Sequence, residues 1–499
     1  MVFIATLVCL IITAASLIAY FIKRRYNYWK RLGIPHDKPV FPYGSVKDYM
    51  TTRHARYVMQ EYYDKYKNAG PFAGMYFFIT PAILVLDLDL VKDILIKDFH
   101  NFSDRGMYTN EKDDPLSGHL FSLDGEKWRT MRNTVSPTFT STPSGKMKFM
   151  FPTIVTVCDE LLEVLSKSVE IDPVIEIKDL LARFTTDVIG TCAFGIECNS
   201  LKDPNVEFRV VGVKAFTKTR HGKIVEGLIF GFPNLAKKLG MRLIHDEIHE
   251  FFMRVVRETV EYREKNSIKR NDFMDLMIEM KNSGSGLTVE QIAAQAFIFF
   301  VAGYETSSMT MGFALYELAR NQEIQDKLRA EINSCYEQHN GQFKYEAMSE
   351  MPYMEKVIKE TLRKYPPSLA LMRKCRNDYP TKNPKFIIPK GTILMIQADA
   401  IQNDPEIYPN PDKFDPERFS PEEVQKRHPM TWLPFGDGPR NCVGLRFGKM
   451  QINIGLSMLL RNYKFDCCEK TQIPLEFDIK NPLLSSKGGI YLRVEKIKQ

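Results

Sequence analysis

The chain has 499 residues, of which 44% are hydrophobic, 26% charged and 12% aromatic, and its net charge is +7. This is the composition of a globular protein with a large core, and no linker, repeat or low-complexity run divides it, so we expect one large domain. The positive excess is modest and no basic–aromatic array accompanies it, which argues against nucleic-acid binding.

The chain contains nine cysteines. Cys467 and Cys468 are adjacent, the others are scattered, and no C-x-x-C motif occurs. This pattern indicates reduced thiols in a protein that faces the cytosol, rather than a disulfide framework or a zinc site.

Residues 1–22 predict a membrane helix, because they carry no charged side chain and are rich in Leu, Ile, Val and Ala. About 20 such residues span a bilayer core. Lys23, Arg24 and Arg25 follow at once, so the positive-inside rule places the rest of the chain in the cytosol. A cleaved signal peptide would need a basic start and a small-residue cleavage site, and both are poor here. We therefore predict an uncleaved signal-anchor.

Residues 23–45 are basic and proline-rich. They predict a stiff hinge, because proline fixes φ and removes a backbone donor. Residues 46–499 then form the large domain. A glycosylation sequon at residues 101–103 should stay unmodified if that domain lies in the cytosol.

Helical periodicity dominates residues 150–365, and strand-like runs are few and short. The predicted fold is mainly α with small β-sheets. The strand-like runs are residues 75–78, 82–86, 386–388, 392–396 and 490–494.

Trp128 and Arg132 are four residues apart, so they share one face of a predicted helix. An indole N–H beside a guanidinium makes a good clamp for a carboxylate, although a simple cation–π pair has the same spacing. Residues 141–144, just after this helix, predict a loop. Further on, residues 227–235 form an apolar run that is interrupted by Gly231 and Pro233. This run is equally consistent with a second membrane contact and with a core segment between two helices.

Thr288 and Gln291 form a capping box that opens a long helix through about Arg320. Within it, Thr306 either faces a ligand or bonds back to the carbonyl of the residue four positions earlier, which is a common habit of helical threonines. Gly303 costs this helix about 1 kcal/mol relative to Ala, so its presence calls for a reason.

Glu360 and Arg363 are three residues apart and close enough to pair on one helix face. Such a pair is usually solvated, but Leu362 and the prolines that follow suggest a packed helix end. Arg418 supplies a second guanidinium amid aromatic residues. We assign Glu360, Arg363 and Arg418 structural rather than catalytic roles.

Residues 435–444 read F-x-x-G-x-R-x-C-x-G, and each position has a physical role if Cys442 is a thiolate bound to haem iron. The glycines allow tight turns and a close approach to a flat cofactor. Arg440 can hydrogen-bond a carboxylate such as a haem propionate. A helical pattern follows Cys442, so the sulfur would lie at a helix N-terminus, which stabilises negative charge. A buried structural cysteine is the simpler alternative.

With this motif, residues 128–132 (W-x-x-x-R), 302–306 (A-G-x-[ED]-T), 360–363 (E-x-x-R) and 416–419 (P-E-R-F) resemble the cytochrome P450 family of haem-thiolate monooxygenases. The resemblance covers nearly all of the chain and is greatest to the insect microsomal kind, family six. It implies a helix-rich prism behind one N-terminal transmembrane helix.

The resemblance also implies site residues. Cys442 would be the axial ligand of haem b, Gly303 would leave space for dioxygen beside the iron, and Thr306 with Glu305 would serve oxygen activation and proton supply. Glu360, Arg363 and Arg418 would lock the cysteine loop. The implied haem-binding side chains are Trp128, Arg132, Arg373, Arg440 and Phe435; Arg373 is a weaker candidate among them, as is Arg105 beside them.

The implied reaction inserts one oxygen atom from O2 into a lipophilic small molecule. The chain has no dinucleotide- or flavin-binding pattern, so electrons from NADPH must arrive through a partner, namely cytochrome P450 reductase on the endoplasmic reticulum membrane, with cytochrome b5 as a second donor. Insect hormones and xenobiotics such as insecticides and plant toxins are the implied substrates. By resemblance the substrate determinants are residues 105–123 with Phe121, 208–216, Ala302, 369–371 and 483–484.

Two other functions remain open. A haem-thiolate isomerase or dehydratase would act on peroxides without external electrons, but such enzymes typically lack an acid–Thr pair such as Glu305 and Thr306. A non-catalytic haem sensor or lipid-binding protein would not need Cys442 and that pair together.

Overall fold

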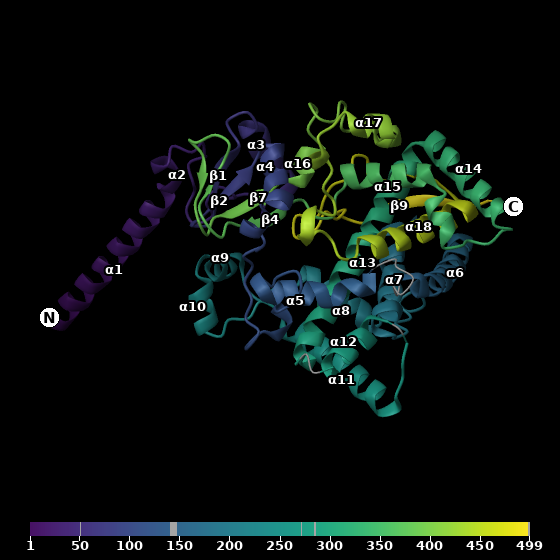
Figure 1. The fold of residues 1–499 in the computed structure, drawn as a ribbon, viewed down its shortest axis with the longest axis horizontal. Helices are drawn as coiled ribbons and strands as arrows, with labels where there is room; N and C mark the ends of the chain where they lie inside the picture. The colour runs from purple at the N-terminus through teal and green to yellow at the C-terminus, as the bar shows by residue number, and fades with distance from the viewer. Residues whose placement is uncertain (50, 140–146, 271, 284–285, 498–499) are drawn as a thin grey trace.

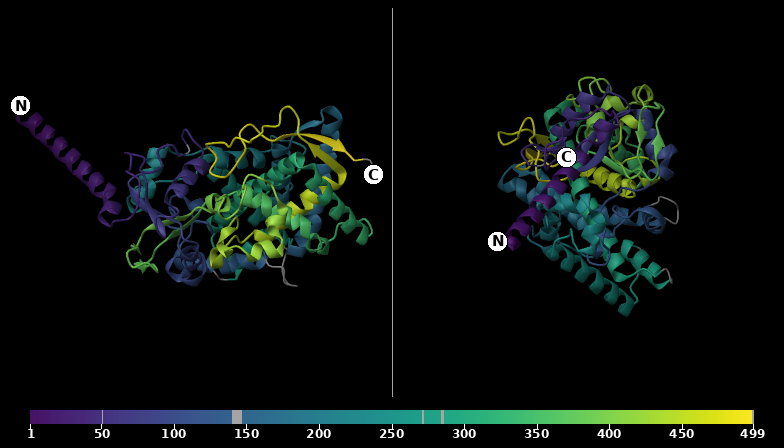
Figure 2. Two further views of the ribbon diagram at one scale, coloured as in Figure 1. Left: turned by 90° about the horizontal axis from the view of Figure 1, so that it is seen from above. Right: turned by 90° about the vertical axis from the view of Figure 1, so that its left-hand side faces the viewer.

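The structure is a computed structural model that describes residues 1–49, 51–139, 147–270, 272–283 and 286–497. The loop expected at residues 141–144 lies outside these described residues. Helix α1 (Val2–Tyr26) projects away from the rest of the chain, as Figures 1 and 2 show. Among the described residues it is the one helix long and apolar enough to cross a membrane, with a mean hydropathy of 2.7 over 18 residues and none of them buried. The predicted N-terminal apolar helix is therefore confirmed.

The segment predicted as a hinge is partly helical and packs firmly. Helix α1 continues through Tyr26, and a short helix α2 (Tyr28–Arg31) follows. Trp29 of α2 is completely buried and donates its indole N–H to the carbonyl of Met75, 2.9 Å away. Beyond it the chain pairs with the first strand, where the N–H of Gly74 donates to Pro35 at 2.8 Å. The spacer is thus attached to the sheet along its length.

The main sheet has four strands in the order β1 (Phe72–Phe77), β2 (Thr80–Val85), β7 (Ile393–Ile396) and β4 (Leu371–Lys374). The β2–β7 pair is parallel and the others are antiparallel, so Arg373 of β4 lies opposite Leu394 of β7. Every predicted strand-like run overlaps an observed strand. The smaller sheets contain β3 (Val174–Glu176), β9 (Tyr491–Lys496) and β8 (Tyr463–Asp466), and β5 (Tyr379–Pro380) with β6 (Ile387–Ile388).

Helices make up most of the described chain, which confirms the mainly α fold (Figure 1). The remaining α-helices are α3 (Ala55–Tyr66), α4 (Leu88–Lys92), α5 (Gly125–Val135), α6 (Met147–Ile171), α7 (Ile177–Ile189), α8 (Glu207–Thr217), α9 (Lys223–Gly231), α10 (Pro233–Lys238), α11 (Asp246–Asn266), α12 (Phe273–Asn282), α13 (Val289–Arg320), α14 (Gln322–Gln338), α15 (Pro352–Lys364), α16 (Ala398–Gln402), α17 (Pro421–Gln425) and α18 (Leu445–Asn462). Short 3-10 and π segments are η1 (Asp93–Lys97), η2 (Phe99–Asn101), η3 (Pro115–Ser117), η4 (Ser136–Phe139), η5 (Gly190–Phe194), η6 (Glu346–Ser349), η7 (Pro416–Phe419), η8 (Pro429–Thr431) and η9 (Gly438–Arg440).

Helix α13 is the central helix of the core and packs against α7, α11, α15 and α18. Both halves of its predicted capping box are present: Thr288 accepts from the N–H of Gln291 at 3.3 Å, and the Gln291 side chain accepts from the N–H of Thr288 at 3.0 Å. Most of its residues are buried all round, as expected for a helix inside a large core. Apart from the two ends of the helix, the residues with accessible surface are Ile298, Val301, Ala302, Gly303 and Thr306, and of these only Ala302 is exposed.

The apolar run at residues 227–235 forms parts of α9 and α10, and its two faces differ. Ile229 is completely buried in a small core cluster with Tyr108 and Ala236, whereas Leu228 (52% exposed) and Leu235 (55% exposed) face outward. The ring of Phe232, between the two helices, lies 6.3 Å from the ring of Phe21 near the end of α1. The exposed apolar surface therefore continues from the membrane helix onto α9 and α10.

The side chains assigned structural roles form a buried charge network between α15 and η7. Glu360 and Arg363 are both completely buried, and two guanidinium nitrogens of Arg363 lie 2.7 and 2.9 Å from the Glu360 carboxylate. The Nε of Arg418 lies 3.5 Å from the same carboxylate. Nη1 of Arg363 donates to the carbonyl of Gln402, and Nη2, which also bonds Glu360, donates to the carbonyl of Pro411. The solvated-pair alternative is therefore wrong.

Replacing Glu360 by Gln tests this network. Glu360→Gln keeps the shape but leaves the Arg363 guanidinium buried without its counter-charge, which should lower the free energy of unfolding by about 3–5 kcal/mol. The matched control is Glu355→Gln on the same helix, because Glu355 is partly exposed and pairs with Lys359 and Lys449. It should cost less than about 1 kcal/mol. Urea unfolding measures both, and equal effects would contradict a structural role for Glu360.

Candidate functional site

The loop at residues 435–444 turns tightly and lies against the segment that follows α4. The N–H of Cys442 donates to the carbonyl of Phe435 at 2.8 Å, which closes the loop. Gly436 and Gly438 both have positive φ, at 66° and 71°. A Cβ at Gly438 would lie 1.8 Å from the carbonyl oxygen of Leu95 in η1. Gly438 is therefore required both by its backbone conformation and by this close approach.

Cys442 lies just before α18, which begins at Leu445 with Gly444 as its N-cap. The predicted helix after the cysteine is therefore confirmed. Burial raises the pKa of the Cys442 thiol, whereas the N–H of Gly444 and the guanidinium groups of Arg132 and Arg105 act in the opposite direction. A thiolate here needs a further positive charge nearby, and a bound metal ion is the partner that deprotonates a coordinating thiol.

Cys442 and Ala302 are exposed residues, although Ala302 lies within a largely buried helix. Both residues have accessible surface, yet burial is the largest influence on the Cys442 pKa, and Ala302 lies in the middle of a buried helix. The Gln451 side chain of α18 donates to the carbonyl of Gly303 on α13 at 3.1 Å. The stretch from Ala302 to Thr306 therefore lies against the first turns of the helix that follows Cys442.

Thr306 makes the back-bond that the sequence left open. Its hydroxyl donates to the carbonyl of Ala302 at 2.7 Å. The hydroxyl oxygen keeps its acceptor lone pairs, so this bond does not prevent Thr306 from holding a water or a ligand.

Gly303 has a packing reason that differs from the expected one. A Cβ at Gly303 would lie 2.8 Å from Cδ1 of Ile189 on α7. The missing side chain therefore allows α13 to approach α7, and the expected space for dioxygen stays a prediction.

Glu305 is buried and points toward α7, α8 and the chain near Asn481. The Asn481 amide donates to the Glu305 carboxylate at 3.4 Å. Burial raises the pKa of Glu305, and the cations Lys178 and Arg209 oppose that shift. Glu305 and Thr306 are neighbours in sequence but no direct hydrogen bond joins them in the described structure. A proton passing from one to the other would need an intervening group.

Two buried guanidinium groups, of Arg373 and Arg440, and the half-buried one of Arg105 gather beside the cysteine loop. Arg440 is 2% exposed, and it donates to the carbonyls of Ser103 and Leu123 and to the Asp124 carboxylate. Arg373 is 1% exposed; burial and the charge of Arg440 lower its pKa to about 10. Burial together with Arg440 and Arg373 also lowers the pKa of Arg105. These cations therefore lie close enough to repel one another.

This cluster fits the two propionates of haem b. The Nε atoms of Arg373 and Arg440 are buried and have no hydrogen-bond partner among the described residues. The Asp124 carboxylate is hydrogen-bonded to this cluster, because it accepts from the Arg440 guanidinium and from the backbone N–H of Arg105. Three guanidinium charges against one carboxylate leave two positive charges, and two propionates would balance them.

Trp128 and Arg132 both lie beside the cysteine loop, but they do not form the expected indole–guanidinium pair. Trp128 is buried, and the guanidinium of Arg440, rather than Arg132, lies over its ring at 4.7 Å. Arg132 donates twice to Asn441, next to Cys442, at 2.8 Å each. Arg132 thus holds the cysteine loop and presents positive charge to Cys442.

Sequence reasoning missed Asp124 and Asn441, and it ranked Arg105 too low. Asp124 directly precedes α5, and a carboxylate next to the W-x-x-x-R helix was the available signal. Phe435 is partly buried, with its ring 6.1 Å from that of Trp432, and its carbonyl holds Cys442.

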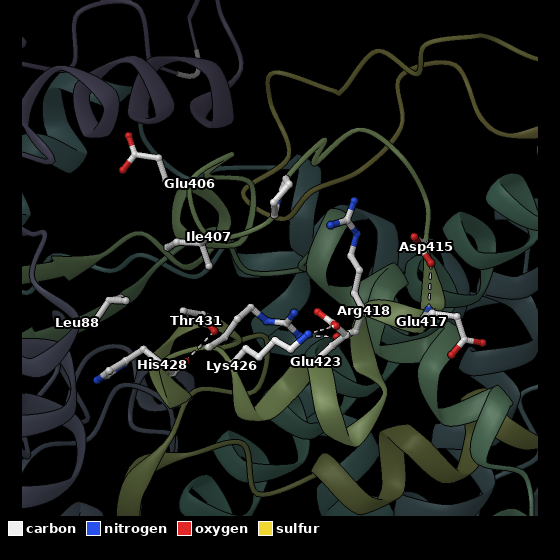
Figure 3. A pocket seen from close by; sticks show the side chains of 12 residues that line it. Leu88, Glu406, Ile407, Asp415, Glu417, Arg418, Glu423, Lys426, His428 and Thr431 are labelled. Carbon is white, nitrogen blue, oxygen red and sulfur yellow. Dashed lines mark hydrogen bonds and ion pairs between the residues drawn. The ribbon is translucent and has the colours of Figure 1, made fainter.

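A cleft of about 710 Å3 lies elsewhere, among α17, η7 and η8. Figure 3 shows its largely charged lining, with Arg418, Glu423 and Lys426 drawn. It contains none of the predicted haem-binding residues, and its charges do not suit a lipophilic ligand. The cleft is therefore separate from the site around Cys442.

The sequence matches the cytochrome P450 family over residues 35–493. It is 50% identical to probable cytochrome P450 6a20 of Drosophila melanogaster, over 99% of this chain and 100% of that protein. It is 49% identical to cytochrome P450 6a2 of the same species, over 98% and 99%, and 48% identical to cytochrome P450 6A1 of Musca domestica, over 97% of each.

The chain therefore belongs to the cytochrome P450 family, whose members bind haem through an axial cysteine thiolate. It is a haem-dependent monooxygenase of the insect family-six type. The predicted family, enzyme class and cofactor are thus confirmed, as is a microsomal, membrane-anchored type of protein.

Substituting Gly438 tests the contact between the cysteine loop and η1. Gly438→Ala adds a clash with Leu95 to the strain of a positive φ, so we expect a lower unfolding temperature and a reduced haem-to-protein ratio. Gly391→Ala is the matched control, because Gly391 has a φ of 82° but nothing within 4 Å of its Cβ position. The control should lose about 1–2 kcal/mol from strain alone and keep its haem. Equal losses in both variants would contradict a role for the η1 contact.

Proposed function

We propose that Cys442 is the axial thiolate ligand of haem b and that Arg105, Arg373, Arg440, Arg132 and Trp128 hold the cofactor, with Phe435 supporting the loop. The observation that carries this proposal is the excess of two positive charges in the buried cluster next to Cys442. When bound, the haem supplies oxygen activation and electron transfer. The protein supplies charge balance, a buried thiol next to a helix N-terminus and exclusion of water.

On this proposal, the stretch of α13 from Ala302 to Thr306 forms the wall that faces the reacting oxygen. The Thr306 hydroxyl donates its proton in a hydrogen bond to the carbonyl of Ala302, and its oxygen accepts a hydrogen bond from a water or oxygen species through its free lone pairs. Glu305 is the proton source behind it, since its raised pKa keeps a proton on the carboxyl closer to neutral pH. Because the two side chains do not touch, a water links them.

Electrons reach the site from outside this chain. NADPH-cytochrome P450 reductase is the proposed donor, with cytochrome b5 as a second one. Exposed cations lie on the elements next to Cys442, namely Lys127 and Arg129 on α5 and Arg446 on α18. They form a docking surface for an acidic partner, and neutralising them should slow reduction and flatten its salt dependence.

The catalytic body, residues 46–499, lies on the cytosolic side of the endoplasmic reticulum membrane in this proposal. Lys23, Arg24 and Arg25 at the end of α1 favour that orientation. The exposed apolar side chains of α9 and α10 rest on the bilayer surface beside α1. Substrates are lipophilic small molecules, namely insect hormones or xenobiotics such as insecticides and plant toxins, that partition into this membrane.

Turnover in membranes containing the protein, reductase, NADPH and O2 tests the reaction, with products identified by mass spectrometry across toxins, insecticides, terpenoids and steroids. Cys442→Ser should abolish the thiolate-specific absorption of the carbon monoxide complex. Thr306→Ala should lower product formed per NADPH consumed by about a hundredfold. Thr310→Ala is the matched control, because Thr310 makes the same back-bond, to Thr306, one turn further along and is buried.

The outcomes separate the alternative functions. Turnover of peroxides without NADPH would support an isomerase or dehydratase. Haem binding without oxygen consumption would support a sensor. Equal losses in Thr306→Ala and Thr310→Ala would contradict the role of Thr306.

Membrane orientation needs an engineered sequon. The natural acceptor Asn101 is buried and hydrogen-bonded to Asn377, so a missing glycan there does not establish which side it faces. Glu469→Asn creates a sequon with Thr471 at an exposed position. We expect no glycan at residue 469 in microsomes, while a sequon appended before Met1 should be modified. A mass increase from Glu469→Asn that endoglycosidase reverses would contradict the cytosolic orientation.

A further inference from the structure

Cys335, His339 and Glu350 bring three metal-ligating side chains together at the end of α14. One ligand atom from each lies within 4.8 Å of the other two. Nε2 of His339 is 2.7 Å from a Glu350 carboxylate oxygen, and Sγ of Cys335 is 4.0 Å from the same oxygen. None of these residues contributes to the haem site or to the charge network around Glu360.

The backbone holds this group in place without help from the three side chains. After α14 the chain reverses at Asn340 and Gly341, which have φ of 55° and 76°, and the N–H of Gly341 donates to the carbonyl of Tyr336 at 2.8 Å. The ring of Phe343 then stacks on Tyr336 at 5.4 Å. These contacts fix η6, and hence Glu350, beside the last turn of α14. Preorganised ligands bind a metal at a lower entropic cost.

The three side chains also differ in accessibility in a way that suits a metal ion. Cys335 is buried, and its thiol contacts the carbonyl of Ala347. The side chains of His339 and Glu350 are 17% and 41% exposed. One side of the cluster therefore opens to solvent, which gives an entry path and leaves room for a water in a fourth position.

The geometry does not suit a nucleophilic thiol. Nε2 of His339 bonds to Glu350, and no hydrogen bond between His339 and Cys335 occurs in the described structure, so the imidazole does not activate the sulfur. A plain His–Glu pair would account for two of the residues but not for the convergence of the cysteine. Sulfur, imidazole and carboxylate together are the ligands that zinc prefers.

We propose that Cys335, His339 and Glu350 bind one thiophilic divalent cation of the zinc class, with water as the fourth ligand. Tetrahedral zinc places ligand atoms about 3.3–3.6 Å apart, so the two observed contacts to Glu350, at 2.7 and 4.0 Å, need adjustments of less than about 1 Å. Binding releases the thiol proton to solvent, and the imidazole binds in its neutral form. The ion would join α14 to the segment that leads into α15, the helix that carries Glu360 and Arg363.

Metal analysis of the full-length haem protein tests the proposal. The probe is Zn2+ alone, added to chelator-treated protein and measured by equilibrium dialysis with elemental analysis, followed by zinc K-edge absorption spectroscopy, which haem iron does not obscure. We expect one high-affinity Zn2+ per chain, one sulfur ligand at about 2.3 Å, and a higher unfolding temperature with Zn2+ than without.

Cys335→Ser and Glu350→Gln should each weaken Zn2+ binding by at least about tenfold, since even indirect partners of a metal ligand contribute that much. Cys335→Ser should also remove the sulfur signal. Both substitutions are nearly isosteric, and circular dichroism of the metal-free variants shows that each is folded. The control is Cys467→Ser combined with Cys468→Ser, which removes the adjacent half-buried cysteines elsewhere and should leave Zn2+ binding unchanged. Zinc bound only by nitrogen and oxygen, zinc lost in the control, or binding unchanged in Cys335→Ser would overturn the proposal.

Discussion

The position of the cysteine loop depends on a buried carboxylate almost 80 residues before it in the chain. Glu360 fixes Arg363, and Arg363 donates to the carbonyl of Gln402. The side chain of Gln402 donates back to α15 and accepts from the N–H of Leu433, directly before the loop that carries Cys442. The loop has only the short 3-10 segment η9 as secondary structure of its own, so contacts with other elements position it, and this relay of hydrogen bonds is one of them. Because each group is buried, losing any one leaves the next without a partner.

The buried charges of the molecule form two clusters. Around Glu360 the guanidinium groups of Arg363 and Arg418 share one carboxylate, and their other hydrogen bonds go to backbone carbonyls. Around Arg105, Arg373 and Arg440 the positive charges exceed the negative ones, and unpaired nitrogens remain. A folded protein tolerates such an imbalance only where an anionic ligand offsets it. Burial alone does not distinguish the two clusters, since Arg373 and Arg440 are about as buried as Arg363, but the larger excess of positive charge does.

Local patterns predicted much of this from sequence, because they involve residues close together in the chain. The capping box of α13, the strands and the helix after Cys442 all depend on short-range rules, and each is present. The roles that were missed depend on distant contacts: Gly303 faces Ile189 on α7, and Arg132 bonds Asn441 across more than 300 residues. The Cys335 cluster also could not be predicted from the sequence, since its three residues follow no zinc-type spacing and come together only after the chain turns at Gly341. Individual site residues therefore followed from motifs, whereas their partners required the fold.

Because Trp29 is buried against the main sheet, the membrane helix α1 is joined rigidly to the rest of the protein. A helix of 25 residues is about 38 Å long, and its uncharged part of about 20 residues matches a bilayer core of roughly 30 Å. Membranes of different thickness change the tilt of such a helix. With Trp29 held by the sheet and Phe21 against Phe232, a change in tilt turns the entire body instead of bending a loose tether. On the proposed contact of α9 and α10 with the bilayer, bilayer thickness therefore determines how deeply these two helices lie in the lipid.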